Sequence, residues 1–150
     1  MPRRWLFKTE PEEYSYDDLE REKKCVWDGV SSNQALKNLR EVKLGDEILI
    51  YHTGNEKAVV GIAEVISDSY PDPNSTDDHL LVVNLKPKRR LSEPLTLAEI
   101  KANEAFSEFD LVRLPRLSVV PISKQYWELL QDMLEMGLLD MQDKNSKCNI

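Results

Sequence analysis

The sequence is poor in the features that mark several large classes of protein. Its 150 residues include only two cysteines, Cys25 and Cys148, which lie far apart and form no CxxC pair. A disulfide framework or a zinc site is therefore not expected, and a reducing compartment is the simpler setting. No apolar run approaches the roughly 20 residues that cross a bilayer, and the first four residues do not begin a signal peptide. We expect an intracellular protein with no membrane partner, cytoplasmic or, in a eukaryotic source, nuclear.

The common catalytic motifs are missing as well. The chain has no GxSxG, P-loop, GxGxxG or HExxH motif, and its two histidines, His52 and His79, have no partners at metal-ligand spacing. A nucleophilic pair of Cys25 and His52 is a weak candidate, because a catalytic cysteine needs an electropositive and accessible setting. We therefore expect no enzyme activity, no metal and no cofactor.

Positive charge is scarce. A net charge of −7 argues at first against nucleic acid, because neutralised phosphates usually supply most of the affinity. The excess lies in residues 46–110, which hold 13 acidic and 6 basic residues, whereas the two ends of the chain are balanced. A basic surface built from the ends, with residues 86–90 as one local run, stays open, although such runs are more often solvated strand ends.

The periodicity that is present predicts one domain, residues 1–150, with a frayed polar tail from about residue 142. Runs of β-forming residues predict strands at 5–9, 47–52, 58–66, 80–85 and 117–122. Pro121 places the last of these near a sheet edge. The turn-forming residues of 70–78 predict a loop.

Capping signatures predict the helices. Capping boxes begin at Ser15, Ser31 and Thr96, and a last helix begins at Ser123 and ends near Gly137. Gly45 is expected to end the helix that Ser31 opens. Short strands, with helices near the start and at the end, predict a small barrel or strongly curved sheet with peripheral helices.

The stretch from Trp27 to Ala35 is the strongest candidate for a ligand site. It places an aromatic ring, a carboxylate, the flexible Gly29 and small polar side chains at a helix start. A core tryptophan before an ordinary capped helix also explains this local pattern. Aromatic rings of Trp27, Tyr51 and Trp5 or Phe7 could stack on a base. Donors and acceptors for its edge could come from Lys8, Thr9, Asp28, Ser32, Asn33, His52 and Thr53.

Several segments, taken together, resemble the EVE domain family of the thymocyte nuclear protein type. They are WLFKTEPEEYSYDDL, WDGV with QALKNLR, KLGDEILIYHTGNEKAVVGIAEV with YPDP, EPLTLAEIK, and LVRLPRLSVVPI with Trp127, in family order from about Trp5 to Leu130. The resemblance implies an α+β, PUA-like fold, a small β-barrel with flanking helices. It also implies distant kinship to the YTH domains, which read methylated adenine in RNA.

The function implied is that of a non-catalytic nucleic-acid-binding module whose pocket takes a modified base. Methylated or hydroxymethylated cytosine is the leading candidate. A PUA-type RNA-binding protein is the alternative, and a small-metabolite binder or enzyme that uses the same pocket is the third. We expect a monomer, with any downstream action supplied by a separate effector protein.

The resemblance also implies which residues line the pocket. The floor would be Lys8 and Thr9, and the cage aromatic would be Trp27. The opposite walls would be formed by Asp28, Ser32, Asn33, Tyr51, His52 and Thr53, with Arg116 and Ser118 meeting the backbone or the base. Many members have an asparagine in place of Ser32 and an aromatic in place of Leu80, which predicts a shallower or differently tuned pocket.

Overall fold

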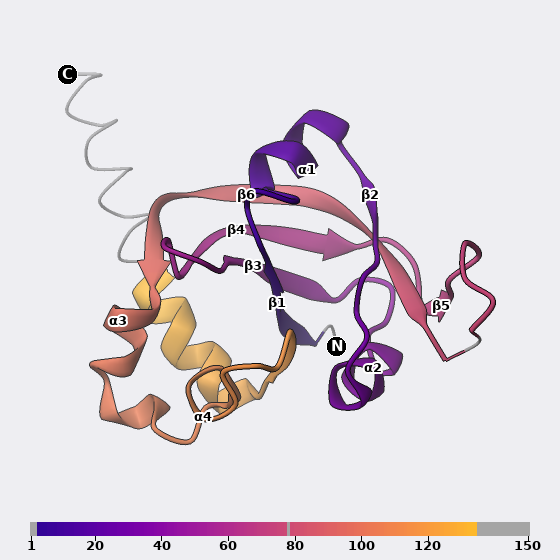
Figure 1. Ribbon diagram of the computed structural model, residues 1–150. Coiled ribbons are helices and arrows are strands. Elements are labelled where there is room, and N and C mark those ends of the chain that lie inside the picture. Colours follow the sequence, from indigo (N-terminus) through magenta and orange to yellow (C-terminus); the bar gives the residue numbers. More distant parts are fainter. Residues whose placement is uncertain (1–2, 78, 135–150) are drawn as a thin grey trace.

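The computed structural model of the protein describes residues 3–77 and 79–134 (Figure 1). The strands are β1 (Arg4–Thr9), β2 (Cys25–Trp27), β3 (Glu47–His52), β4 (Ala58–Val65), β5 (Tyr70–Pro71), β6 (Leu81–Thr96) and β7 (Val119–Ile122). The helices are α1 (Tyr16–Glu22), α2 (Asn33–Arg40), α3 (Leu97–Lys101), the 3-10 helix η1 (Glu104–Phe106) and α4 (Asp110–Arg113). Residues 124–134 form a further helix up to the limit of the description.

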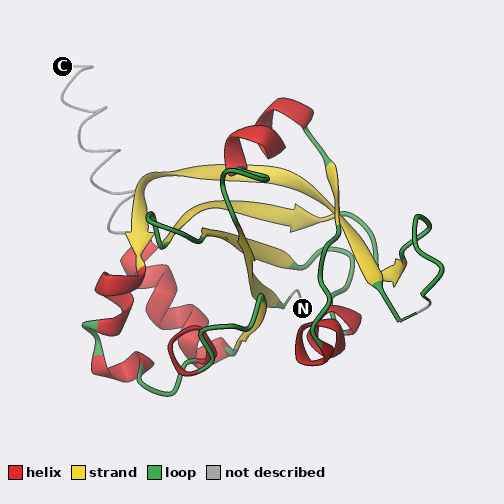
Figure 2. Cartoon of the chain, in the orientation of Figure 1, coloured by secondary structure: helices red, strands yellow, loops and turns green. Residues whose placement is uncertain are grey.

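The strands form one mixed sheet in the order β2-β6-β4-β3-β1-β7, and β5 pairs with β6. The sheet curls into a half-barrel with helices at its flanks, which confirms the α+β, PUA-like fold expected from the sequence (Figure 2). Strand β1 lies next to the edge strand β7, and it runs parallel to β3 and antiparallel to β7. The first strand therefore pairs with segments that come about 40 and 115 residues later.

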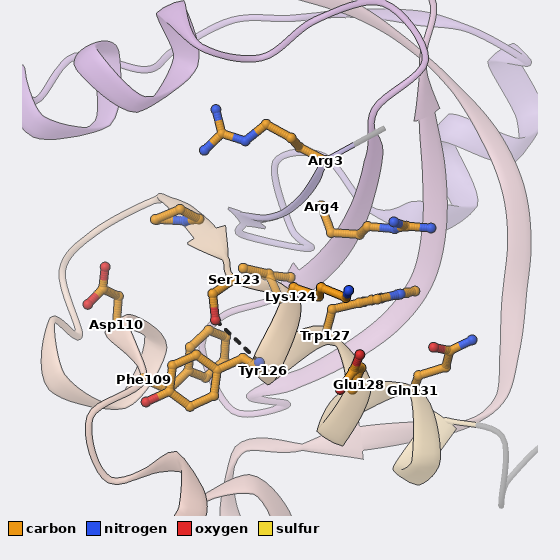
Figure 3. A pocket seen from close by; sticks show the side chains of 12 residues that line it. Arg3, Arg4, Phe109, Asp110, Ser123, Lys124, Tyr126, Trp127, Glu128 and Gln131 are labelled. Carbon is orange, nitrogen blue, oxygen red and sulfur yellow. Dashed lines mark hydrogen bonds between the residues drawn. The ribbon is translucent and has the colours of Figure 1, made fainter. Parts of the chain in front are cut away.

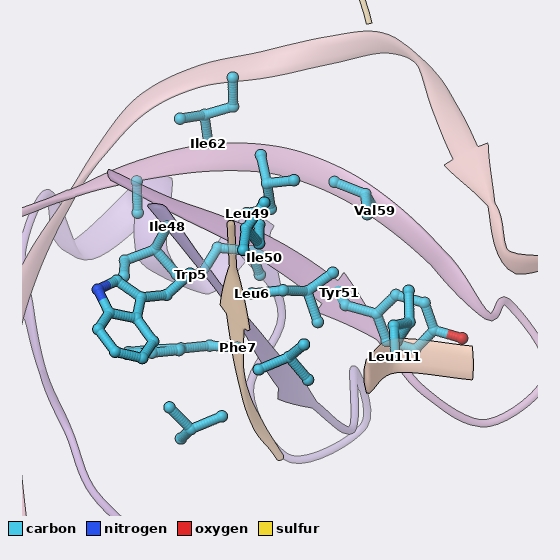
Figure 4. Close-up of a cluster of buried hydrophobic side chains, with 14 of the residues drawn as sticks. Trp5, Leu6, Phe7, Ile48, Leu49, Ile50, Tyr51, Val59, Ile62 and Leu111 are labelled. Atoms are coloured by element: carbon cyan, nitrogen blue, oxygen red, sulfur yellow. The ribbon is translucent and has the colours of Figure 1, made fainter. Parts of the chain in front are cut away.

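The core lies on the three central strands. Trp5, Leu6 and Phe7 of β1 are fully buried and pack among the apolar side chains of β3 and β4 (Figure 4). Nearly every residue of β4 is buried, as its continuous apolar run predicts. Phe106, Phe109 and Tyr126 make a smaller aromatic cluster, with ring centroids 4.8–5.7 Å apart, that packs η1 against helix 124–134.

A buried carboxylate fixes the beginning of β1. Asp46 is 3% exposed and accepts three N–H groups: the indole of Trp5 at 3.0 Å, the backbone of Arg3 at 2.9 Å and the backbone of Lys43 at 3.0 Å. A buried carboxylate with three donors is well satisfied. The strand that carries Lys8 is therefore tied at its start to the turn before β3.

Helix α1 is seated on the sheet through its first residue. The ring of Tyr16 lies against Gly61 of β4, so closely that a Cβ at position 61 would come within 2.5 Å of it. The Tyr16 hydroxyl donates to the carbonyl of Ile62 at 2.7 Å. Gly61 is thus the position that lets the α1 tyrosine reach the sheet.

Several predicted boundaries are confirmed. Ser15 and Thr96 form complete capping boxes with Asp18 and Glu99. Helix 124–134 begins after Ser123, whose hydroxyl accepts the Tyr126 N–H. Strand β7 lies at the sheet edge, as its proline predicts, although it begins at Val119 rather than 117. The predicted helix end near Gly137 and the frayed tail from 142 lie outside the described residues.

The prediction for the start and end of α2 is wrong. The cap is Ser32, which accepts the N–H of Ala35, rather than Ser31 with Gln34. Ala35 at the third helical position cannot complete a capping box, because it carries no side-chain acceptor. Gly45 has the expected left-handed backbone (φ +94°), but α2 already ends at Arg40. Gly45 serves the turn into β3, where its N–H donates to the carbonyl of Val65.

Two strand predictions also need correction. Tyr70 and Pro71, expected in a loop, pair with β6 as β5. The strand predicted to end at Leu85 continues to Thr96 through two prolines. Strand β2 pairs with β6 only up to Leu85, so beyond that residue one side of β6 is an edge. A proline is tolerated there because no partner strand needs its missing N–H.

Candidate functional site

A cavity of about 430 Å³ opens where β1 ends, between β2 and the segment leading into β7. We call it the Trp27 cavity. Its lining residues are Lys8, Thr9, Glu10, Glu13 and Tyr14 from β1 and the turn after it, Cys25, Val26, Trp27, Asp28, Gly29 and Val30 from β2 and the turn after it, and Ser118. Three segments that are far apart in the sequence therefore meet at one site.

The aromatic wall of this cavity is held rigidly. Trp27 is only 7% exposed, and its ring lies against Phe7 with the centroids 5.6 Å apart. Tyr14 meets the same ring edge-on at 6.0 Å. Behind the wall, Gly29 turns the chain with φ +81°, a conformation that glycine adopts far more easily than other residues. Trp27 is thus a fixed wall, with little of its surface open to the cavity.

Lys8 joins two sides of the cavity. Its backbone N–H donates to the Ser118 carbonyl at 3.0 Å, and its ammonium donates to the Pro115 carbonyl at 2.8 Å. Burial lowers the pKa of Lys8 below its usual value, because desolvation disfavours the charged form. An ammonium has three N–H donors, so two remain beyond the bond to Pro115.

Carboxylates outnumber cations around the cavity. Glu10, Glu13 and Asp28 line it and are exposed, whereas Lys8 is the one cation among the lining residues. Carboxylate oxygens accept hydrogen bonds and repel anions. The site therefore suits a neutral ligand that offers N–H donors as well as acceptors, and disfavours a phosphate.

Cys25 lies in the cavity without the setting of a nucleophile. Burial raises the pKa of its thiol to about 11, and burial also raises the pKa of Tyr14, whose hydroxyl donates to Glu22 at 3.0 Å. His52 engages elsewhere: its Nε2 accepts the Tyr16 N–H at 3.0 Å, and its Nδ1 lies 2.8 Å from Glu56. A catalytic pair of Cys25 and His52 is thus unsupported.

We expect Cys25 to react slowly with iodoacetamide. The thiol pKa of about 11 lies two units above the ordinary value of 9.0, so at pH 8 its thiolate should be about a hundredfold rarer. The rate, followed by mass spectrometry in a Cys148→Ser background, should rise about tenfold for each pH unit up to pH 10. The denatured protein serves as the control, and a rate that levels off below pH 9 would contradict this assignment.

A second cavity, of about 680 Å³, lies across the segment 114–118 and is called the Arg116 cavity. Ser32, Gln34 and Asn38 line it from α2 and its cap, and Arg113, Pro115 and Arg116 line it from the other side. Asn38 donates to the Val119 carbonyl at 2.8 Å, which ties α2 to β7.

Comparison with known proteins identifies the family. The EVE domain model matches residues 3–133. The chain belongs to the EVE domain family. Human thymocyte nuclear protein 1 is 28% identical over 165 residues, which cover 87% of this chain and 73% of the relative.

Solved structures show the same fold. A hypothetical protein from Leishmania major is 32% identical with a TM-score of 0.83, covering 91% of this chain and 96% of that one. Human THYN1 protein in complex with 5-methylcytosine-containing DNA is 26% identical with a TM-score of 0.80, covering 89% of this chain and 98% of that one. The family resemblance seen in the sequence is therefore confirmed.

The EVE structure brings five of the eleven expected site residues into the Trp27 cavity. They are Lys8, Thr9, Trp27, Asp28 and Ser118. Ser32 and Arg116 line the Arg116 cavity instead. Leu80, which stands where many relatives have an aromatic, lines a smaller cavity of about 260 Å³ behind Asp28 and Gly29.

The other four expected residues line neither cavity. His52 is buried beneath the start of α1, and Thr53 donates from both its N–H and its hydroxyl to the Thr9 carbonyl. Tyr51 is 4% exposed, with its ring centroid 5.8 Å from the Lys8 ammonium. Asn33 is exposed at the first position of α2. These four residues therefore form no part of the surface of either cavity.

Sequence reasoning missed Glu10, Glu13 and Tyr14 as lining residues. The available signal was their position, because they directly follow Lys8 and Thr9 in the TEPEEY motif. Thr9 also donates through its hydroxyl to the Tyr14 carbonyl at 2.7 Å, which folds the turn back over the cavity. Residues that directly follow a strand can line the same cavity as the last residues of that strand.

Within 3–77 and 79–134, no three His, Cys, Asp or Glu side chains are grouped so that they could hold a metal ion. None of the helices in that part of the chain has the length and apolar character needed to cross a membrane.

Proposed function

We propose that this EVE domain is a non-catalytic reader of a modified base in DNA, with 5-methylcytosine as the leading ligand in the Trp27 cavity. The observation that carries the proposal is that Lys8 and the three acidic residues Glu10, Glu13 and Asp28 line one cavity beside an aromatic wall. Cytosine presents an amino group that donates hydrogen bonds, next to ring atoms that accept them. A carboxylate and an ammonium are complementary to that edge.

The charge of the cavity supports a base rather than a phosphate as the occupant. A neutral base can be extruded from its stack for a few kcal/mol, and edge hydrogen bonds and ring contacts can offset that cost. Because Trp27 is mostly covered by Phe7 and Tyr14, its ring can contribute a wall contact more than a full stacking surface. Edge recognition should therefore carry more of the selectivity than stacking.

The human relative supports the choice of DNA. THYN1 shares the fold over 89% of this chain and is in complex with 5-methylcytosine-containing DNA. In a eukaryotic source, the name of the thymocyte nuclear proteins supports a nuclear location. A monomer that binds one base would need a separate effector protein to act on the signal.

We expect Asp28→Asn to lose most of the preference for 5-methylcytosine. If its carboxylate accepts the cytosine amino group, the neutral amide should disfavour insertion of the base, so that the methyl group is no longer read. The affinity for the methylated strand should then fall about tenfold, toward that of the unmethylated strand, because one good edge contact is worth about 1–3 kcal/mol. Fluorescence anisotropy would measure dissociation constants for short strands and hairpins that differ only in the methyl group. Lys8→Met should lose affinity by a similar factor.

The matched control is Asp132→Asn, which makes the same change on the exposed face of helix 124–134. It should bind like the wild type. Equal wild-type affinity for methylated and unmethylated strands would refute the reader, and an unaltered preference in both Asp28→Asn and Lys8→Met would refute the cavity assignment. An RNA strand of the same sequence that competes better than the DNA would reassign the protein to RNA.

A further inference from the structure

We propose that the strand carrying the inserted base continues through the Arg116 cavity and on past Pro121, so that Arg116 and Lys124 hold its phosphates. This inference rests on the proposed function and extends it from the base to the strand that bears it. It identifies a backbone track with two cations that can hold the phosphates of a strand, on a protein whose net charge is −7.

The first argument is the contrast of charge across one wall. The Trp27 cavity has three carboxylates to one ammonium and so repels the phosphates beside the inserted base. The Arg116 cavity has Arg113 and Arg116 among its lining residues and Asp110 as its single carboxylate. Phosphates displaced from the first cavity therefore find favourable charge in the second.

Arg116 is the cation available for a phosphate. Arg113 is already paired with Asp110 at 2.7 Å. Arg116 is exposed, and the salt bridges among the described residues do not include it. A free guanidinium can meet a phosphate through two parallel N–H bonds.

The two cavities share a wall, which fixes their order along a strand. Lys8, which lines the first cavity, donates through its ammonium to the carbonyl of Pro115, which lines the second. Ser118, three residues further on, returns to the first cavity. When one nucleotide enters the Trp27 cavity, the adjacent nucleotide of the strand thus lies at the segment 115–118, next to Arg116.

The Arg116 cavity continues into a third one. Asp110 and Pro121 line both the Arg116 cavity and a cavity of about 580 Å³ at the start of helix 124–134 (Figure 3). We call the latter the Trp127 cavity. Its lining includes exposed Lys124 and the half-buried Trp127, with Asp110 and Glu128 as the opposing charges. Arg4 covers one face of the Trp127 ring at 4.8 Å.

This third cavity offers the two kinds of group that single strands need. Lys124, like Arg116, is absent from the salt bridges of the described residues, so it can neutralise a phosphate. The aromatic side chains of Trp127 and Tyr126 can contact a sugar or base. The track therefore leads from an acidic base site to a basic end that also carries aromatic rings.

The test uses Arg116→Gln and Lys124→Gln in the full chain, with strands that carry one 5-methylcytosine or none. At 0.1 M salt, each variant should bind both strands about fivefold more weakly, with the ratio between the strands unchanged. The slope of log affinity against log salt should become less steep by about 0.7 for each cation removed. Arg89→Gln, an exposed position on β6 at the opposite side of the sheet, is the matched control and should leave the slope unchanged.

Strand extension gives an independent readout. Adding nucleotides on one side of the modified base should strengthen binding more than adding them on the other, and Lys124→Gln should abolish that difference. An unchanged slope in Arg116→Gln, or an equal loss in Arg89→Gln, would overturn the track. If the track failed in this way but Asp28→Asn still erased the preference for the methylated strand, the proposed base-reading function would stand and only the track would fall. A wild-type protein that bound neither strand would overturn both.

Discussion

Asp46→Ala should lower the free energy of unfolding by about 4 kcal/mol, because it leaves one buried and two partly buried N–H donors without their acceptor. The indole of Trp5 and the backbone N–H groups of Arg3 and Lys43 all donate to this one carboxylate. Urea unfolding followed by tryptophan fluorescence would measure the loss. The effect is large because Trp5 is fully buried and water cannot replace the lost oxygen atoms.

Asp46→Asn separates the hydrogen bonds from the packing. An amide of nearly the same shape keeps one acceptor oxygen, so this variant should fall between Asp46→Ala and the wild type. An Asp46→Ala protein within 1 kcal/mol of the wild type would show that the turn relaxes and that Asp46 does not hold β1.

Gly61→Ala is expected to cost about 3 kcal/mol of stability through overpacking. The added methyl group would come within 2.5 Å of the Tyr16 ring, which is 1% exposed and hydrogen-bonded to the carbonyl of Ile62. Moving the ring away would disturb that hydrogen bond and the contact of the ring with the Arg90 guanidinium. The same urea titration measures the loss, and the midpoint should fall without a change in slope.

A double-mutant cycle with Tyr16→Leu tests the mechanism. The smaller side chain removes the clash, so the double variant should be more stable than the sum of the two single losses implies. Additive losses would mean that the methyl group at position 61 disturbs something other than Tyr16. The cycle also reports on α1, because Tyr16 is the residue through which that helix meets β4.

Local patterns predicted the elements whose cause is local. The capping boxes at Ser15 and Thr96 follow from residues within a few positions of one another. So do the strands predicted at 5–9, 47–52 and 58–66, which the structure has at 4–9, 47–52 and 58–65. The prediction of the α2 cap was wrong by one residue. Ser31 and Ser32 both satisfy the cap preference, and only the path of the chain from β2 selects between them. The extension of β6 through its prolines failed because it depends on where β2 stops pairing.

The candidate site was only half predictable for a similar reason. The family motifs mark a neighbourhood, and Lys8, Thr9, Trp27, Asp28 and Ser118 do meet there. Tyr51 and His52 of β3 are both buried, and neither reaches the surface of the cavity. His52 lies under α1, where it accepts a backbone N–H. Which face a motif residue takes depends on register across strands, and a single sequence carries no direct record of that register.

The pairing of β1 with β7, the first strand of the sheet with the last, bears on how the domain folds during synthesis. The residues of β1 are synthesised first, whereas those of its partner β7 are among the last strand residues to leave the ribosome. The hydrogen bond from the Lys8 N–H to the Ser118 carbonyl, which closes the Trp27 cavity, joins residues 110 positions apart. Contacts at such separation form late, because the intervening chain must already be arranged. The binding site is thus complete only when the first strand has paired with the segment around Ser118. A nascent or truncated chain that lacks this segment has no formed pocket for a base.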